Sequence, residues 1–210
     1  MSKDRRLRIP ALLERGWDGS AGQLAALRQS EYYELLTDAY RELRTDTLYS
    51  SHLHGVGHIE RVILLGALIA RNEGFSRHDA MLLLRCCAYH DLGREDDGED
   101  PGHGERSAKK LASAYFDFAR RDLTAADLPI LYAAVAAHSM SDKRRGETGL
   151  RYGVSDGDRA RYEEIAACLK DADNLDRVRL GDLDPSHLRH EGSLALVPFA
   201  EELYREYERR

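Results

Sequence analysis

The segment from His78 to Leu92 constrains the fold most, because it is apolar on almost every side. A helix that is apolar all round is normally buried at the centre of a bundle. The segments around it repeat apolar residues at intervals of three and four, which is the period of an amphipathic helix. No stretch of convincing length alternates between apolar and polar residues as a half-buried strand does. The sequence therefore predicts an all-α bundle.

The predicted helices share this period and are separated by polar or glycine-rich stretches. They cover residues 30–48, 57–72, 78–92, 105–120, 125–138, 158–175 and 194–207. A chain of 210 residues is usual for one domain. We expect a single domain over residues 1–210, with its core at about 30–177. The apolar residues of the segments 7–13 and 194–207 pack either on this core or on a second copy in a homodimer, and both arrangements remain open.

Charge and composition argue against two classes of protein. There are 37 acidic and 31 basic residues, for a formal net charge of −6, which argues against general nucleic-acid binding through phosphates. The longest apolar run, residues 62–70, is about half of a bilayer span. No apolar signal segment follows the charged start, and three cysteines suit no disulfide framework. We expect a cytoplasmic protein that binds neither nucleic acid nor membrane.

Histidines and aspartates point inward from separate predicted helices. The inward set comprises His58, His90, Asp91, His138 and Asp173, each on an apolar face or at the end of an apolar helix. A buried carboxylate is costly unless it is paired or holds a metal, and too few lysines or arginines share these faces to pair with it. A mixed nitrogen and oxygen set suits a divalent transition metal such as Mn, Fe, Co, Ni or Zn. The sequence therefore predicts a site for one or two metal ions.

The order and surroundings of these residues resemble the HD superfamily of metal-dependent phosphohydrolases. The pattern consists of H-I-E-R-V at 58–62, A-Y-H-D-L-G-R at 88–94, His138, and D-A-D-N-L-D at 171–176. The HD dipeptide alone is common, whereas the ordered set at helix ends is specific. The resemblance spans about residues 54–177 and implies a helical bundle of the HD type. It also implies that one metal ion is held by His58, His90, Asp91 and Asp173.

Some branches of this superfamily bind a second ion through two further histidines. His103 and His138 occupy those places, as ligands of a second metal or as substrate contacts. His103 follows Asp91 by only 12 residues, so an exposed His103 near a helix start is the alternative. Asn174 stands where many relatives have arginine. The acidic loop 94–102 is interpreted as a lid or rim over the site.

The resemblance also implies a reaction. It is the hydrolysis of a small phosphorylated compound, with nucleotides favoured, by water that the metal activates. Asp91 is expected to bridge to a second metal or to hold this water. Catalytic cations are expected to stabilise the charge on the phosphoryl oxygens, and other residues to contact the substrate. The catalytic candidates are Asp91, Arg94 and Arg61, and the substrate-binding candidates are His54 at the rim, Lys170 and Arg177.

Two other functions remain open. Some HD proteins use six ligands in the order H, HD, H, H, D to hold two irons and carry out oxygen-dependent cleavage, and this chain formally matches that order. The other alternative is a non-catalytic helical module that senses a ligand through the metal site. The intact ligand set favours an enzyme over such a module.

Overall fold

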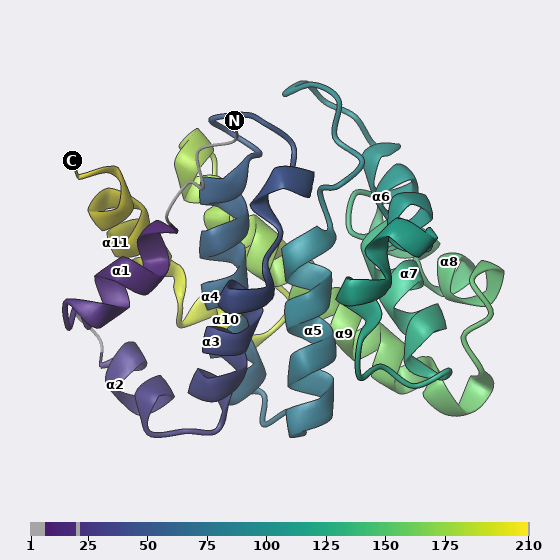
Figure 1. Cartoon of the computed structure of the whole chain (residues 1–210), viewed down its shortest axis with the longest axis horizontal. Coiled ribbons are helices and arrows are strands. Elements are labelled where there is room, and N and C mark those ends of the chain that lie inside the picture. Colours follow the sequence, from purple (N-terminus) through teal and green to yellow (C-terminus); the bar gives the residue numbers. More distant parts are fainter. Residues whose placement is uncertain (1–6, 20–21, 210) are drawn as a thin grey trace.

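The computed structural model describes residues 7–19 and 22–209. Within these ranges the chain forms helices and turns and no strand, so the predicted all-α fold is confirmed. Figure 1 shows α4 and α5 side by side in the middle of the molecule. Helices α1, α2 and α11 lie on one side of this pair and α6 to α8 lie on the other, while α3 packs against both helices of the pair.

The principal helices match the predicted segments, with two interruptions. They are α3 (Tyr32–Glu42), α4 (Val56–Asn72), α5 (Arg77–Tyr89), α6 (His103–Leu111), α7 (Asp127–Ala137), α9 (Arg159–Leu175) and α11 (Val197–Glu208). The predicted helix over 105–120 breaks at Ser113, whose backbone is extended and whose hydroxyl donates to the carbonyl of Lys110 at 2.7 Å. The predicted helix over 30–48 ends at Glu42, and a short 3₁₀ turn follows it.

The other α-helices of the described residues are shorter: α1 (Arg8–Glu14), α2 (Gln23–Arg28), α8 (Arg145–Arg151) and α10 (Glu191–Leu194). Short 3₁₀ helices lie between some of the α-helices. Helix α8 lies inside the stretch 139–157, which the sequence predicts to be a polar loop. Its buried residues are only Thr148 and Gly149, so it carries no apolar stripe that periodicity could reveal.

Two helices, rather than one, occupy the centre of the bundle. Helix α5 is buried from Leu82 to Tyr89, as its apolar sequence predicts. Helix α4 is buried without interruption from His58 to Ala70, although its sequence suggests a single apolar stripe. The reason is that α1, α3, α5, α9 and α11 all pack against it. A polar side chain in this part of α4 therefore needs a partner inside the protein.

One such polar side chain connects both terminal segments to the core. The buried carboxylate of Glu60 accepts a hydrogen bond from the backbone N–H of Ile9 at 3.0 Å and one from the hydroxyl of Tyr207 at 2.7 Å. Its backbone carbonyl accepts from the Tyr40 hydroxyl at 2.7 Å. In this chain the segments around α1 and α11 therefore pack on their own core, while a homodimer stays a prediction.

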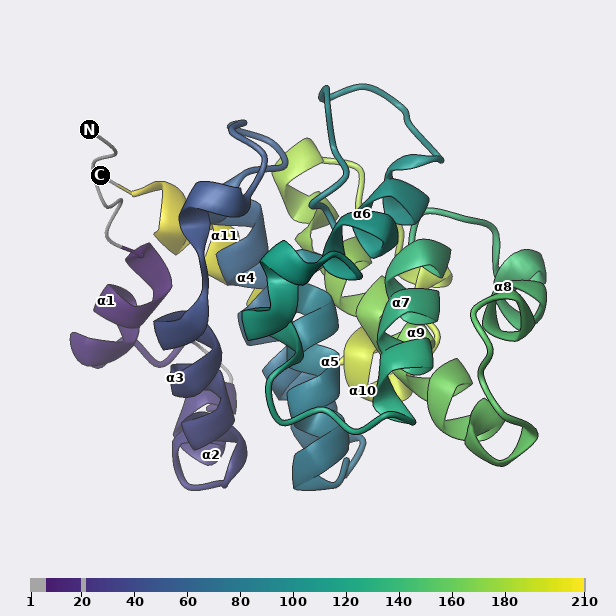
Figure 2. The same ribbon diagram turned by 45° about the vertical axis from the view of Figure 1, so that its right-hand side comes forward.

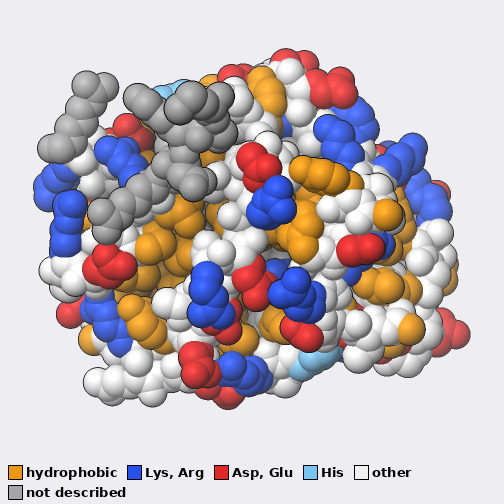
Figure 3. All heavy atoms as spheres, in the orientation of Figure 1, with side chains coloured by type: hydrophobic (Ala, Val, Ile, Leu, Met, Phe, Trp, Pro, Cys, Tyr) orange, Lys and Arg blue, Asp and Glu red, His pale blue; other side chains and the backbone are white. Residues whose placement is uncertain are grey.

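The surface carries interspersed charges of both signs. On the face drawn in Figure 3, basic and acidic side chains alternate and no broad basic area appears. In the part of the chain that the structure describes, no helix has the length and apolar character needed to cross a bilayer.

The buried carboxylate of Asp127 gives the fold a dependence on pH. It accepts hydrogen bonds from Arg161 at 2.6 Å, from Thr124 at 2.7 Å, and pairs with His78 at 2.8 Å. Burial alone raises the pKa of this carboxyl, but these partners outweigh burial and lower it to about 2. The stabilisation is therefore complete above the unfolded pKa near 4 and is lost as the pH falls towards about 2.

We expect Asp127→Ala to lower the free energy of unfolding at pH 7 by about 2–3 kcal/mol, because Arg161 loses a charged partner. Urea unfolding at pH 7 and pH 3 measures this difference. The gap between the wild type and the variant should narrow at pH 3. An equal gap at both pH values would show that Asp127 acts through packing alone.

Candidate metal centre

Five helices begin or end at one cluster of histidines and aspartates. His58 lies in the first turn of α4, and His90 and Asp91 follow the last residue of α5. His103 begins α6, His138 follows α7, and Asp173 lies in the last turn of α9. Each of these side chains therefore lies at a helix terminus, and the packing of neighbouring helices fixes its position. The structure brings together all the residues that the sequence predicts as metal ligands.

The carboxylate of Asp91 is at the centre of this cluster. Its Oδ2 atom lies 3.6 Å from Nε2 of His58 and 3.8 Å from Nε2 of His90. Its Oδ1 atom lies 3.1 Å from Nε2 of His103 and 3.6 Å from Nε2 of His138. The two oxygens thus face two different histidine pairs, which is the geometry of a bridging carboxylate.

Hydrogen bonds on the far side of each ring determine which nitrogen faces the cluster. Nδ1 of His90 lies 2.9 Å from the carbonyl of Cys87, and Nδ1 of His138 lies 2.6 Å from the carbonyl of Val135. His103 makes the same kind of contact to a backbone carbonyl. A carbonyl oxygen only accepts, so each Nδ1 must carry the hydrogen. In the neutral ring, Nε2 then carries no hydrogen, and its lone pair points into the cluster.

These lone pairs face one another in two pairs. Nε2 of His58 lies 3.1 Å from Nε2 of His90, and Nε2 of His103 lies 2.8 Å from Nε2 of His138. Two lone pairs cannot form a hydrogen bond with each other, so a proton or a metal cation must lie between them. Burial lowers the pKa of His90 to about 3, which keeps this ring neutral and its lone pair available.

The carboxylates supply the matching negative charge. Burial raises the pKa of the Asp91 and Asp173 carboxyls, but the surrounding histidines outweigh burial and hold both well below the ordinary value. Oδ1 of Asp173 lies 3.3 Å from Nε2 of His58 and 3.8 Å from Nε2 of His90. The residues therefore fit one divalent transition metal at His58, His90, Asp91 and Asp173. They fit a second at Asp91, His103 and His138.

A glycine explains how His103 reaches the cluster so soon after Asp91. A Cβ atom on Gly93 would lie only 2.3 Å from the backbone carbonyl of His103, so only glycine permits this approach. The N–H of Gly93 donates to the hydroxyl of Ser107 at 2.7 Å and ties the turn after Asp91 to α6. The acidic residues 94–102 loop outward between these two points. His103 is therefore buried rather than exposed at a helix start.

Comparison with known proteins agrees with this geometry. A family model described as HD domain matches residues 55–178, well over half of the chain. The chain belongs to the HD domain family. This match runs from α4 to just beyond α9 and includes every residue of the two metal positions. No curated protein and no solved structure matches the chain at a significant level.

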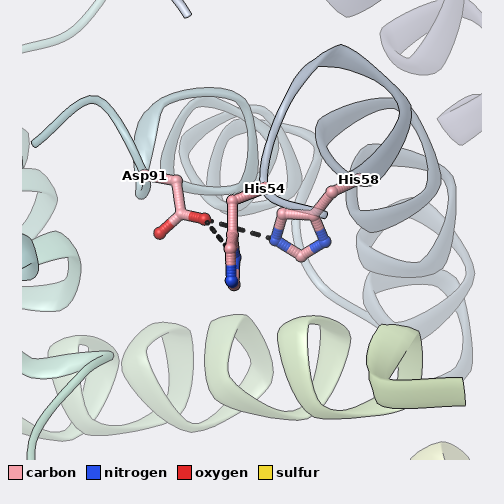
Figure 4. A group of neighbouring side chains, drawn as sticks. All are labelled: His54, His58 and Asp91. Atoms are coloured by element: carbon pink, nitrogen blue, oxygen red, sulfur yellow. Dashed lines mark ion pairs between the residues drawn. The ribbon is translucent and has the colours of Figure 1, made fainter. Parts of the chain in front are cut away.

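His54 lies inside the cluster of this HD domain, although the sequence predicts it at the rim. Its side chain is only 8% exposed, and Nδ1 lies 3.4 Å from Oδ2 of Asp91. Figure 4 shows His54, His58 and Asp91 directed toward one another. The prediction of a rim position fails because the turn before α4 folds back, with the N–H of His54 donating to the Ser51 hydroxyl at 3.2 Å.

Arg61 occupies a different place from the one that the sequence predicts for a catalytic cation. Its Nε and Nη2 donate to the two oxygens of Asp176 at 2.6 and 3.0 Å. Asp176 also lies 2.8 Å from Nδ1 of His58, the side of the ring that faces away from the cluster. The Arg61 guanidinium packs over the rings of Tyr204 and Tyr207, and Arg61 lines a cavity of about 640 Å³ together with Gly57 and Tyr207.

Of the three remaining cations, one lies at the cluster, one is buried elsewhere and one is partly exposed. Arg94 lies at the cluster, with Nε 3.5 Å from Oδ1 of Asp91. Lys170 and Arg177 lie outside it, contrary to their predicted place beside the substrate. The ammonium of Lys170 donates to the carbonyl of Met140, and Arg177 pairs with exposed Asp182.

The sequence reasoning assigned no role to Asp176 or Arg179. Asp176 orients His58, and its spacing of three residues from Asp173 in D-A-D-N-L-D is a signal that both share a helix face. Arg179 donates to the backbone carbonyls of Leu53 and Asp176 at 2.9 and 3.0 Å, and so holds the turn that carries His54. No motif in the sequence marks Arg179.

We expect Asp176→Ala to weaken metal binding about 10–100-fold, because His58 loses the carboxylate that fixes its tautomer and orientation. Titration of chelator-treated protein with Mn²⁺ or Zn²⁺ measures this affinity. Asp182→Ala is the matched control, since Asp182 lies in the same region and pairs only with Arg177 among the described residues. Equal affinities for the two variants would contradict an orienting role for Asp176.

Proposed function

We propose that this HD domain is a metal-dependent phosphohydrolase that acts on a small phosphorylated compound. The observation that carries the proposal is the convergence of four histidine Nε2 atoms on the two oxygens of Asp91. The resemblance to the HD superfamily supplies the reaction class and favours a nucleotide as the substrate. A bound divalent ion lowers the pKa of water and polarises a phosphoryl oxygen.

The chain's own residues hold the reacting groups in place. Asp91 and the histidine pairs would hold the ions, and Asp173 would complete the first set of ligands. The side chain of Asp173 is 27% exposed, whereas His58 and His90 are fully buried. Solvent, and therefore a substrate, reaches the cluster from the Asp173 side. The depressed pKa of Asp91 keeps it ionised, so it can accept a hydrogen bond from a water molecule.

Arg94 is the cation best placed to contact a phosphoryl group. Its side chain is 12% exposed and Nη1 donates to the carbonyl of Gly98 at 2.8 Å. Its Nε is buried and has no hydrogen-bond partner, because the 3.5 Å contact with Asp91 is not aligned as a hydrogen bond. A buried donor without a partner is costly, and a phosphoryl oxygen beside Asp91 would satisfy it.

The acidic loop narrows the range of substrates. Its residues Glu95 to Glu99 are exposed, and Asp97 is tied to Ser51 in the turn that precedes His54. Negative charge beside the cluster repels a long polyanion more than a compact phosphate ester. This arrangement supports a small substrate and agrees with the proposal that nucleic acid is not a partner.

We expect Asp91→Ala to lose its bound metal and to lower turnover of phosphoesters by about 10³-fold, since a metal supplies several kcal/mol of transition-state stabilisation. Metal content per chain and a screen of nucleotides and other phosphoesters measure the two effects. Asp156→Ala, an exposed aspartate in a surface turn, is the control. An Asp91→Ala protein that is metal-free and fully active would refute the proposal.

We expect Arg94→Ala to retain its metal while kcat falls about 10²-fold, because the transition-state charge loses one donor. Metal analysis and steady-state kinetics on the substrate found in the screen separate the two effects. An unchanged kcat would show that Arg94 does not act on the substrate and instead holds the acidic loop through its hydrogen bond to Gly98.

A di-iron oxygenase is the second candidate function. Six residues match the order H, HD, H, H, D and lie in one cluster, which supports this candidate: His58, His90, Asp91, His103, His138 and Asp173. Activity that persists without oxygen excludes this reaction, whereas iron-dependent oxygen consumption with an organic substrate supports it. Binding of a phosphorylated ligand without any product would instead indicate a sensing module.

A further inference from the structure

A second group of metal-ligating side chains lies on α9, away from the HD centre. Glu164 and Cys168 are four residues apart and share one face of the helix, and His190 approaches them from the segment before α10. Nε2 of His190 lies 3.3 Å from Oε1 of Glu164, and both ring nitrogens lie 4.0 Å from Sγ of Cys168. One ligand atom from each residue lies within 4.8 Å of the others.

The ring of His190 is held as metal-bound histidines usually are. Its Nδ1 lies 2.8 Å from Oδ2 of Asp171, a fully buried carboxylate. Asp171 also accepts from the backbone N–H of Arg189 at 3.0 Å and from the Arg189 guanidinium at 2.9 Å. A carboxylate on one nitrogen of a histidine fixes the ring and leaves the other nitrogen for a metal. Here that other nitrogen is the one that faces Glu164.

Negative charge accumulates around this group. The side chain of Glu164 is 48% exposed and pairs with His190. Glu73, just after the end of α4, lies over Gly192. The hydrogen bond with Asp171 is the main cause that raises the pKa of His190, burial is the main cause that raises the pKa of the Cys168 thiol, and Glu73 adds a smaller contribution to both. Arg189 is already paired with Asp171 and Asp142. A cation bound by His190 would balance this charge better than a single proton on the ring.

We propose that Glu164, Cys168 and His190 form a sulfur-containing site for Zn²⁺ or a similar thiophilic divalent ion. Thiolate, imidazole and carboxylate are all ligands of zinc, and a water molecule or Glu73 would occupy the fourth position. On binding, the Cys168 thiol releases its proton to solvent, as does any proton on Nε2 of His190. The half-exposed Glu164 gives the ion a path from solvent.

Such a site would join two parts of the chain that are distant in sequence. It would fasten the segment around α10 to α9, and Figure 2 shows α10 beside α9. Helix α9 also carries Asp173, five residues after Cys168. The ligands are separate from those of the HD centre, which contains no sulfur. The role of the proposed ion is therefore structural.

Cobalt absorption tests this proposal without any measurement of activity. Only a thiolate ligand gives a sulfur-to-cobalt charge-transfer band, so the nitrogen and oxygen ligands of the HD centre do not contribute to it. We expect chelator-treated, reduced wild-type protein to develop this band on titration with Co²⁺. Cys168→Ser should abolish the band, whereas Cys86→Ser, which alters another fully buried cysteine, should retain it.

Glu164→Gln provides a variant that keeps the buried thiol in place. Because this side chain is half exposed, the substitution retains the fold. We expect it to lower the affinity for Co²⁺ at least about 10-fold, since even the loss of a residue that only orients a ligand lowers metal affinity about 10–100-fold. Circular dichroism confirms folding of each variant. No charge-transfer band in the wild type at saturating Co²⁺, or a band that persists in Cys168→Ser, would overturn the proposal. In either case His190 serves as a protonated link between Asp171 and Glu164.

Discussion

The contact between the Asp91 carboxylate and the surrounding imidazoles is the interaction on which the rest of this HD domain depends. An ionised carboxylate with almost no access to solvent is stable only among partners that share its charge. Four histidines direct Nε2 atoms at its two oxygens at 3.1 to 3.8 Å. Each histidine comes from the end of a different helix. Four helix ends must therefore meet at one place, and Asp173 adds the end of α9. This requirement fixes how the bundle is assembled.

A layer of residues behind the cluster keeps those imidazoles in the required tautomer. Backbone carbonyls hold His90 and His138, because both rings follow the last turn of a helix and reach back to it. His58 instead lies in a first turn, where no carbonyl of its own helix is available. The carboxylate of Asp176 accepts the hydrogen bond from Nδ1 of His58 instead, and Arg61 balances the charge of Asp176. His103, which begins α6, is held by the carbonyl of Asp100 in the loop before the helix, so His58 is the one of these four histidines that depends on a buried ion pair.

The central position of α5 and the clustering of the candidate ligands could be predicted from sequence, because burial and metal binding restrict residue types at fixed spacings, whereas the burial of α4 on all sides could not. Helix α8 could not, since its buried residues carry no apolar stripe. The position of Arg61 could not be predicted from the sequence either. Its spacing from His58 puts it on the same helix face, but only the packing of α11 supplies the tyrosines and only the end of α9 supplies Asp176. Lys170 likewise contacts a loop whose path the sequence does not define.

The sequence by itself determined the helical class and indicated the candidate metal ligands, since periodicity and residue chemistry are local properties of the chain. The tertiary structure decided which face of each imidazole meets which carboxylate oxygen, and that His54 and His103 are buried in the cluster. It also brought His190 to Glu164 and Cys168. These outcomes depend on contacts between segments far apart in sequence. Such contacts follow from the packing of whole helices and from close approaches such as that at Gly93, which no local pattern encodes.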